Sequence, residues 1–340
     1  MMEYIVCEQP GKLRKMVKRP PEKAEGTAII DIKRIGVCGT DIHAFKGNQP
    51  FFKYPRVLGH ELAGTVSWID DTSSAIKRGD QVAVIPYLEC GNCIACRNGK
   101  TNCCIDMNVL GVHRDGGMCE QLSVPIDHLV LTNELTLDET AVIEPISIGA
   151  HAVRRSELRQ GGETVLVIGA GPIGLGVMAI ANQKGAKVIA MDIDEKRLKF
   201  CREWAQIKHT VNGSKAPIDK LLEITNGELP TVVFDATGNP TSMNTAFQYV
   251  SHGGKLVYVG LVKEDITFFD PDFHAKELTL FASRNATRED FQFVKEMILS
   301  KKVNVKDYIT DKVPFESTVS NFQDWLQPQS DTIKTMIVRK

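Results

Sequence analysis

The most constraining feature of the sequence is a glycine-rich turn that directly follows a short apolar run. Residues 164–168 (TVLVI) lead into residues 169–174 (GAGPIG), a GxGxxG pattern at the start of a helical segment. The first glycine allows a tight turn, the second lets the backbone approach a pyrophosphate, and the third lets the helix pack on the strand. The helix N-terminus also offers free N–H groups to phosphate. We therefore expect five residues to bind a dinucleotide: Gly169, Gly171, Pro172, Ile173 and Gly174.

Apolar runs alternate with helical segments from residue 163 onward. Short apolar runs flanked by helices are typical of the buried strands of a parallel sheet. Six runs qualify: 164–168, 187–191, 209–211, 231–234, 255–259 and 278–281. Six strands is the number in a doubly wound dinucleotide-binding fold, so this part of the chain is predicted to be an α/β Rossmann domain.

An acidic residue ends the second of these runs. Asp192 lies eighteen positions beyond Gly174. A carboxylate there accepts hydrogen bonds from the adenosine ribose and repels a 2′-phosphate, so the sequence favours NAD over NADP. Arg197 is a candidate contact of the same ribose, but it could equally be a solvated helix residue, and both interpretations remain open.

The first 150 residues follow a different pattern. Short apolar runs separated by Gly and Pro predict strands at 28–35, 57–66, 80–85 and 120–124, which are typical of an irregular β barrel. A chain of 340 residues exceeds what one hydrophobic core normally supports, so we expect two domains that meet near residue 150. A helix is predicted at 289–300, and the apolar segment 333–338 could return to the first domain.

Five of the nine cysteines are crowded into residues 90–104. In an intracellular protein, close CxxC repeats are more often metal ligands than disulfides. Cys90, Cys93, Cys96 and Cys104 have the spacing with which one loop wraps a tetrahedral ion, and four protein ligands make a closed, structural zinc site. Cys103 is adjacent, and the spacing alone does not separate it from Cys104 as the fourth ligand.

A second candidate metal site combines residues from separate segments. Cys38 begins residues 38–43 (CGTDIH), His60 and Glu61 follow Gly59, and Glu144 precedes Pro145. Three protein ligands of this kind leave a fourth zinc position open for water or an alcohol. Each residue taken alone has an ordinary structural explanation, so the hypothesis depends on the set.

The charge balance disfavours large polyanionic partners. The chain has 41 Lys+Arg and 42 Asp+Glu, a net charge of -1, so no broad electrostatic footprint indicates nucleic acid or an anionic membrane. The opening segment lacks the basic region of a secretory signal, and no apolar stretch approaches the about 20 residues that span a bilayer. We expect a cytoplasmic protein that acts on a small molecule.

Taken together, these segments resemble the zinc-dependent medium-chain alcohol dehydrogenase family, and its sorbitol (polyol) and sugar-acid dehydrogenase branch in particular. The resemblance covers essentially the whole chain and is carried by residues 36–43, 58–64, 90–104, 143–152 and 169–174. It implies a GroES-like β-barrel catalytic domain at 1–150 with a structural-zinc lobe at about 88–106, a Rossmann domain at 151–285, and a return to the catalytic domain at 286–340. The active site would lie in the cleft between the domains.

The resemblance also implies roles for individual residues. Cys38, His60 and Glu61 would bind the catalytic zinc, and Glu144 would coordinate it directly or through its water; which glutamate is the inner ligand stays open. Thr40 would take the proton of the alcohol and pass it through the nicotinamide ribose to His43. Arg284 would lie near NAD and a zinc-site glutamate, could reach a sugar-acid carboxylate, or could form a simple ion pair.

The expected activity is zinc-dependent oxidation of a secondary alcohol, a CH–OH donor, with hydride transfer to NAD. An L-sugar acid of the galactonate or idonate type is favoured as substrate, with a polyol and L-threonine as alternatives. A non-catalytic protein that binds NAD and zinc is the alternative from another class. Members of this family are often oligomers, and the run 278–281 could extend a sheet across a two-fold axis, so a homo-oligomer is expected, dimer or tetramer.

Overall fold

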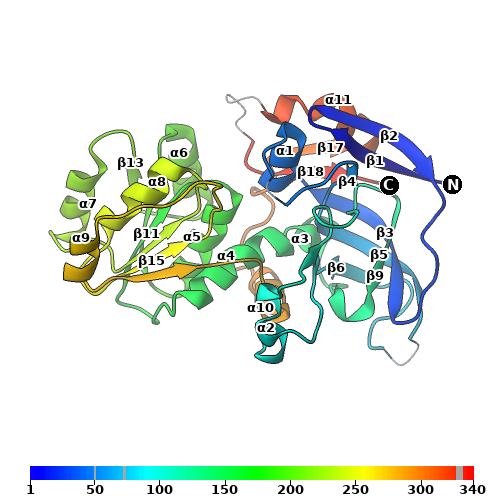
Figure 1. Cartoon of the computed structure of the whole chain (residues 1–340), viewed down its shortest axis with the longest axis horizontal. Helices are drawn as coiled ribbons and strands as arrows, with labels where there is room; N and C mark the ends of the chain where they lie inside the picture. The colour runs from blue at the N-terminus through cyan, green and yellow to red at the C-terminus, as the bar shows by residue number, and fades with distance from the viewer. Residues whose placement is uncertain (50, 72–73, 327–331) are drawn as a thin grey trace. The chain divides into compact units, whose positions relative to one another are not determined.

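The computed structural model describes residues 1–49, 51–71, 74–326 and 332–340. The chain forms two compact units, Met1–Pro145 with Ala286–Lys340, and Ile146–Asn285 (Figure 1). Within the described ranges, none of the helices has the length and apolar character needed to cross a membrane.

The first unit is built mainly on antiparallel strands, with one parallel pair. A seven-stranded sheet has the order β10-β6-β5-β3-β18-β17, and β9 also pairs with β3. These strands are β3 (Thr27–Gly36), β5 (Glu61–Ile69), β6 (Gln81–Val84), β9 (Gln121–Pro125), β10 (Leu129–Leu131), β17 (Asp311–Pro314) and β18 (Thr335–Val338). A smaller sheet contains β1 (Met2–Gln9), β2 (Lys12–Lys18) and β4 (Arg56–Val57). Because β18 pairs with β3, the C-terminal segment is a strand of this unit.

The strand predicted at 57–66 is two strands, β4 and β5, which belong to different sheets. The chain leaves the strand conformation at residues 58–60 because the Gly59 N–H donates to the Asp41 carboxylate instead of a neighbouring strand. This interruption places His60 between the two strands. The other three predicted strands correspond to β3, β6 and β9.

An apolar cluster of buried side chains lies within the first unit. Alternate residues of β3, among them Ile30 and Ile32, are fully buried and pack with Leu62 and Val66 of β5. Burying one such side chain contributes roughly 1.5–3 kcal/mol, so the pairing of β3 with β5 is held by both ladder hydrogen bonds and core packing. The helices of this unit are α1 (Gly39–Lys46), α2 (Ile94–Arg97), α3 (Leu137–Ala141), α10 (Arg288–Leu299) and α11 (Thr318–Asn321).

The second unit is a six-stranded parallel sheet with helices. Its order is β13-β12-β11-β14-β15-β16, the 3-2-1-4-5-6 order of the doubly wound fold, which confirms the predicted Rossmann domain. The strands are β11 (Thr164–Ile168), β12 (Lys187–Asp192), β13 (His209–Asn212), β14 (Val232–Asp235), β15 (Lys255–Tyr258) and β16 (Thr279–Ala282). Its helices are α5 (Pro172–Gln183), α6 (Glu195–Trp204), α7 (Pro217–Thr225), α8 (Pro240–Thr245) and α9 (Asp270–Ala275), and α4 (Ile143–Arg155) begins at the end of the first unit.

The burial of the central strands explains why their sequences are continuous apolar runs. Val165, Leu166 and Val167 of β11 are all fully buried, as expected for a strand covered on both faces. The edge strand β16 differs, since Leu280 is 41% exposed.

Candidate active site

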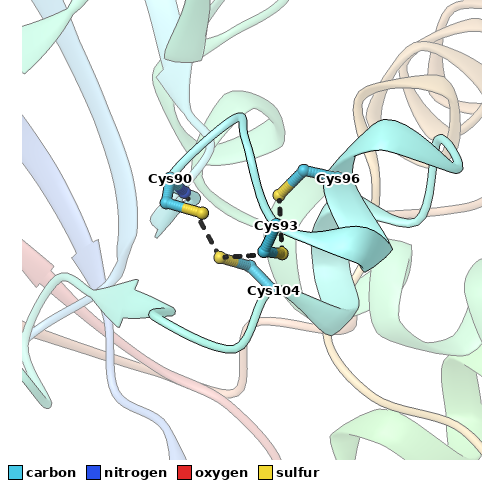
Figure 2. A group of neighbouring side chains, drawn as sticks. All are labelled: Cys90, Cys93, Cys96 and Cys104. Carbon is cyan, nitrogen blue, oxygen red and sulfur yellow. Dashed lines mark hydrogen bonds between the residues drawn. The ribbon is translucent and has the colours of Figure 1, made fainter.

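Four cysteines converge in a lobe between two short strands of the first unit. The strands β7 (Tyr87–Leu88) and β8 (Asn108–Val109) pair and close the base of the lobe. The Sγ atoms of Cys90, Cys93, Cys96 and Cys104 all lie within 4.8 Å of one another, and the Cys93 Sγ to Cys96 Sγ distance is 3.4 Å (Figure 2). Cys103, by contrast, is exposed and lies outside this cluster.

Backbone hydrogen bonds and burial act in opposite directions on the thiols of the lobe. Hydrogen bonds from the N–H groups of Cys96 and Ile105 lower the pKa of Cys93 to about 6, whereas burial raises the pKa of Cys96 to about 12 and also raises the pKa of Cys104. The Cys90 N–H donates to the Cys104 sulfur at 3.2 Å. Four thiolates in one small volume repel one another unless a cation lies among them, and a tetrahedral sulfur set is the preferred environment of zinc. The donors present therefore fit a closed zinc site.

Cys38, His60 and Glu61 form a second cluster, with one ligand atom from each within 4.8 Å of the others. Cys38 caps the N-terminus of α1, His60 lies in the interruption between β4 and β5, and Glu61 begins β5. His60 and Glu61 are buried, while Cys38 is half-buried. A sulfur, an imidazole and a carboxylate are a donor set that zinc accepts in open sites.

Asp41 ties the two ligand-bearing segments together. Its carboxylate is fully buried and accepts hydrogen bonds from the Cys38 N–H at 2.9 Å and from the Gly59 N–H at 3.1 Å. His60 Nδ1 lies 4.0 Å from the same carboxylate and is a buried nitrogen without a hydrogen-bond partner among the described residues. A metal-bound imidazole typically directs its second nitrogen to a carboxylate, so this arrangement also fits a metal at His60.

Negative charge dominates the surroundings of His60. Burial alone would lower the pKa of His60, but Cys38, Asp41 and Glu144 outweigh burial and raise it well above its usual value. A site that attracts a proton this strongly also attracts a divalent cation.

Glu144 lies in the first turn of α4 and is buried, and its Oε1 accepts a hydrogen bond from the hydroxyl of Tyr87. Burial raises the pKa of Glu144 to about 7. Glu144 is not a member of the three-residue cluster. The structure therefore brings Cys38, His60 and Glu61 together, whereas Glu144 is hydrogen-bonded to Tyr87. Tyr87 comes from β7, at the base of the four-cysteine lobe.

The remaining predicted catalytic residues lie on α1. Thr40 is half-buried and His43 is exposed. They are three positions apart in the helix, which places them on neighbouring positions of one face.

The predicted dinucleotide turn lies between β11 and α5. Gly169 has a φ of 95°, a conformation that favours glycine. A Cβ atom at Gly174 would lie 1.8 Å from the carbonyl oxygen of Gly169, so the close approach of helix and strand requires glycine there. Pro172 and Ile173 are the first two residues of α5.

The acid and the two arginines predicted near the cofactor occupy different positions in the second unit. Asp192 accepts hydrogen bonds from Ala170 N at 2.7 Å and from Asp194 N at 3.0 Å, so its carboxylate touches the glycine-rich turn. Arg197 lies on α6, and its Nη1 is 3.6 Å from the position of a Cβ built on Gly171. Arg284 follows β16 and is exposed.

Comparisons with known proteins agree with this arrangement. The alcohol dehydrogenase GroES-like domain matches residues 24–134, and the zinc-binding dehydrogenase domain matches residues 172–300. L-galactonate-5-dehydrogenase of Escherichia coli K12 is 42% identical over 99% of this chain and 98% of its own length. The chain belongs to the zinc-dependent medium-chain alcohol dehydrogenase family.

Other members of the family extend the comparison. The probable D-xylulose reductase A of Emericella nidulans is 33% identical over 90% of this chain and 88% of that protein. The solved structure of the rspB alcohol dehydrogenase of Escherichia coli CFT073, complexed with NADH, has a TM-score of 0.92 at 28% identity and covers 99% of both chains. This family member is therefore a zinc-binding dehydrogenase, an oxidoreductase of CH–OH groups, and the resemblance and the fold class inferred from its sequence are confirmed.

Three residues near the cluster of Cys38, His60 and Glu61 were not anticipated from the sequence. They are Asp41, Tyr87 and Lys334. Lys334 is 1% exposed, and its Nζ donates to both carboxylate oxygens of Glu61. The sequence feature that could have indicated Lys334 is a single lysine inside the apolar run 333–338. Asp41 stands at the third position of the helix after Cys38, where acidic residues cap helices, but nothing in the sequence distinguishes Tyr87.

Gly36 offers a direct test of the cluster. A Cβ atom at this position would lie 2.0 Å from Glu61 Oε2, so Gly36→Ala should displace the Glu61 carboxylate. We expect the variant to lose about 1–3 kcal/mol of stability through overpacking. Thermal unfolding measures this loss. Gly39→Ala is the matched control because no atom lies within 4 Å of its added Cβ, and an equal change in Tm in both variants would contradict the prediction.

Proposed function

We propose that this dehydrogenase oxidises a secondary alcohol of an L-sugar acid, of the galactonate or idonate type, to the ketone with NAD as hydride acceptor. The observation that carries the choice of substrate is the 42% identity to L-galactonate-5-dehydrogenase over nearly the full length of both chains. The chemistry is supported by the open cluster of Cys38, His60 and Glu61. A four-cysteine site, in contrast, is closed to substrate and serves the structure of its lobe.

Cys38, His60 and Glu61, with Glu144, would hold the catalytic zinc, and Cys90, Cys93, Cys96 and Cys104 would hold the structural zinc. Zinc bound in the open site supplies a Lewis acid that makes a coordinated hydroxyl more acidic. Thr40 would accept the proton of the alcohol, and the exposed His43 would exchange a proton with solvent. Asp41 keeps Cys38 and His60 in position through its two backbone hydrogen bonds.

The glycine-rich turn and its neighbours would bind NAD. Gly169, Gly171, Pro172, Ile173 and Gly174 would hold the pyrophosphate at the N-terminus of α5. Asp192 and Arg197 would bind the adenosine ribose, and Arg284 would bind NAD or the carboxylate of the substrate. NAD, when bound in this way, accepts the hydride.

The proposal is tested by measuring NADH formation with zinc-loaded protein on a panel of sugar acids, polyols and L-threonine. We expect the highest kcat/KM with an L-sugar acid and little activity with NADP. The similarity to D-xylulose reductase A makes a polyol the second candidate, so a polyol preference would reassign the substrate within the family. Silence across the panel, with both zinc ions and NAD bound, would contradict the proposed substrate class.

Asp192→Asn should weaken the preference for NAD. The substitution keeps an acceptor oxygen but removes the charge that repels a 2′-phosphate. We expect kcat/KM with NAD to fall about tenfold, which corresponds to about 1.4 kcal/mol of transition-state stabilisation. The ratio of kcat/KM with NAD to kcat/KM with NADP should fall by more than this, because the charge that repels the 2′-phosphate is gone. Steady-state kinetics with both cofactors measure the ratio, and an unchanged ratio would show that Asp192 does not select the cofactor.

We further propose a homo-oligomer that forms through β16. This strand lies at the edge of the parallel sheet, so its outer N–H and C=O groups have no strand partner within the described chain, and Leu280 is 41% exposed. An edge strand of this kind can pair with its copy across a two-fold axis. Light scattering should give a mass of at least two chains, and a monomer would contradict the proposal.

A cytoplasmic location is consistent with the state of the cysteines. All nine are unpaired, which is the state that a reducing compartment maintains and that both zinc clusters require.

A further inference from the structure

Lys334 is a buried lysine that binds one of the candidate zinc ligands. Its Nζ lies 2.6 Å from Glu61 Oε1, 2.8 Å from Glu61 Oε2 and 3.1 Å from the carbonyl oxygen of Val37. An ammonium group has three N–H donors, so all three are used. Both side chains are 1% exposed, so the ion pair is shielded from bulk water.

These contacts join Lys334 to both segments of the zinc cluster. Val37 directly precedes Cys38, and Glu61 directly follows His60. The lysine itself comes from the residue before β18, a strand that pairs with β3. A third segment of the first unit, distant in sequence, therefore carries a fixed positive charge to the cluster.

The two carboxylates of the site have different partners. Glu61 pairs with the cation Lys334, whereas Glu144 accepts a hydrogen bond from the neutral hydroxyl of Tyr87. Lys334 thus neutralises the charge of Glu61 through two direct hydrogen bonds, whereas Lys334 and His60 act on Glu144 only through their charges. A carboxylate that already binds an ammonium through both oxygens is a weaker ligand for a second cation, because the two positive charges repel each other at short range.

We infer that Lys334 competes with the catalytic zinc for Glu61 and so acts as a positioning residue that keeps one coordination position available to the substrate. The inference rests on the proposed zinc site at Cys38, His60 and Glu61. It assigns unequal roles to the two glutamates. Glu61 stays hydrogen-bonded to Lys334, and Glu144 would be the carboxylate that binds the metal or its water.

The test is a comparison of metal retention in four forms of the whole chain: the wild type and three variants. Lys334→Met removes the charge but keeps the length of the side chain, so Glu61 becomes free to bind the metal fully. We expect zinc at this site to bind at least about tenfold more tightly in competition with a chelator, because a nearby repulsive charge is gone. Lys334→Arg keeps the charge and should match the wild type. Lys312→Met removes an exposed lysine paired with Asp138 and is the control for loss of a lysine.

Cobalt substitution gives a second readout that does not depend on turnover. The visible absorption of cobalt reports the number of its ligands. In Lys334→Met we expect the weaker absorption of a higher coordination number, and in Lys334→Arg the wild-type spectrum.

Thermal unfolding with and without zinc adds a check on folding. The gain in Tm on adding zinc should be larger in Lys334→Met than in the wild type, and the added Glu61→Gln substitution should remove this excess.

The outcomes separate the inference from the proposed function. A wild-type protein that holds only the zinc of the four-cysteine lobe would overturn the zinc site itself. A wild type with two zinc ions, together with a Lys334→Met variant that binds zinc no more tightly than Lys334→Arg, would overturn the competition alone. Should Lys334→Met fold only with zinc, the rates of zinc release from the loaded proteins make the same comparison.

Discussion

Cys38→Ser should abolish nearly all turnover while leaving NAD binding intact. The substitution removes the thiolate from the open cluster, whose other two members are His60 and Glu61. Metal activation of a substrate oxygen contributes several kcal/mol to transition-state stabilisation, so kcat/KM should fall by on the order of a thousandfold or more. The assay is NADH formation, and calorimetric titration with NAD shows that the second unit is unaffected.

This variant also separates an enzyme from a protein that only binds NAD and zinc. If the chain is a catalyst, the wild type turns over and Cys38→Ser does not, although both bind NAD. A wild type that binds both cofactors but never turns over would favour the non-catalytic alternative. Full turnover by Cys38→Ser would contradict the mechanism directly.

The second large effect is expected in the four-cysteine lobe. Cys104→Ser should remove one zinc per chain and destabilise the lobe, because Cys104 is buried within the cluster. Structural zinc binds small peptides with about 10–16 kcal/mol, so even partial loss of this interaction should lower the free energy of unfolding by several kcal/mol. Metal analysis and thermal unfolding measure the two effects.

Cys103→Ser is a closely matched control for that variant. The two cysteines are adjacent in sequence, but Cys103 is exposed and its sulfur lies outside the cluster. We expect Cys103→Ser to keep both zinc ions and the wild-type Tm. If the two variants behaved alike, or if Cys103→Ser were the one to lose zinc, the assignment of the fourth ligand would be wrong.

Much of the fold could be predicted because its signals are local. The strand β11 and the turn that follows it lie within a few residues of each other, and the buried strands of a parallel sheet are continuous apolar runs. The four cysteines of the lobe likewise lie on one short segment. In these cases the spacing of residues along the chain was sufficient to predict the structure.

The parts that could not be predicted depend on contacts between distant residues. Lys334 and Glu61 are 273 positions apart, and Tyr87 and Glu144 are 57 apart. Neither pair leaves a pattern in a single sequence, since a lone lysine in an apolar run or a tyrosine in a strand has many explanations. The division of 57–66 into two strands was missed for the same reason, because it depends on the hydrogen bond of Gly59 with Asp41.

The most direct test of the account is the position of zinc in crystals of the zinc-loaded protein, measured by diffraction on both sides of the zinc absorption edge. We predict two anomalous peaks per chain, one among Cys90, Cys93, Cys96 and Cys104, and one bound by Cys38 and His60 beside Glu61 and Glu144. A fully loaded, NAD-binding protein with a peak only in the four-cysteine lobe would contradict the central claim that this chain holds an open, catalytic zinc.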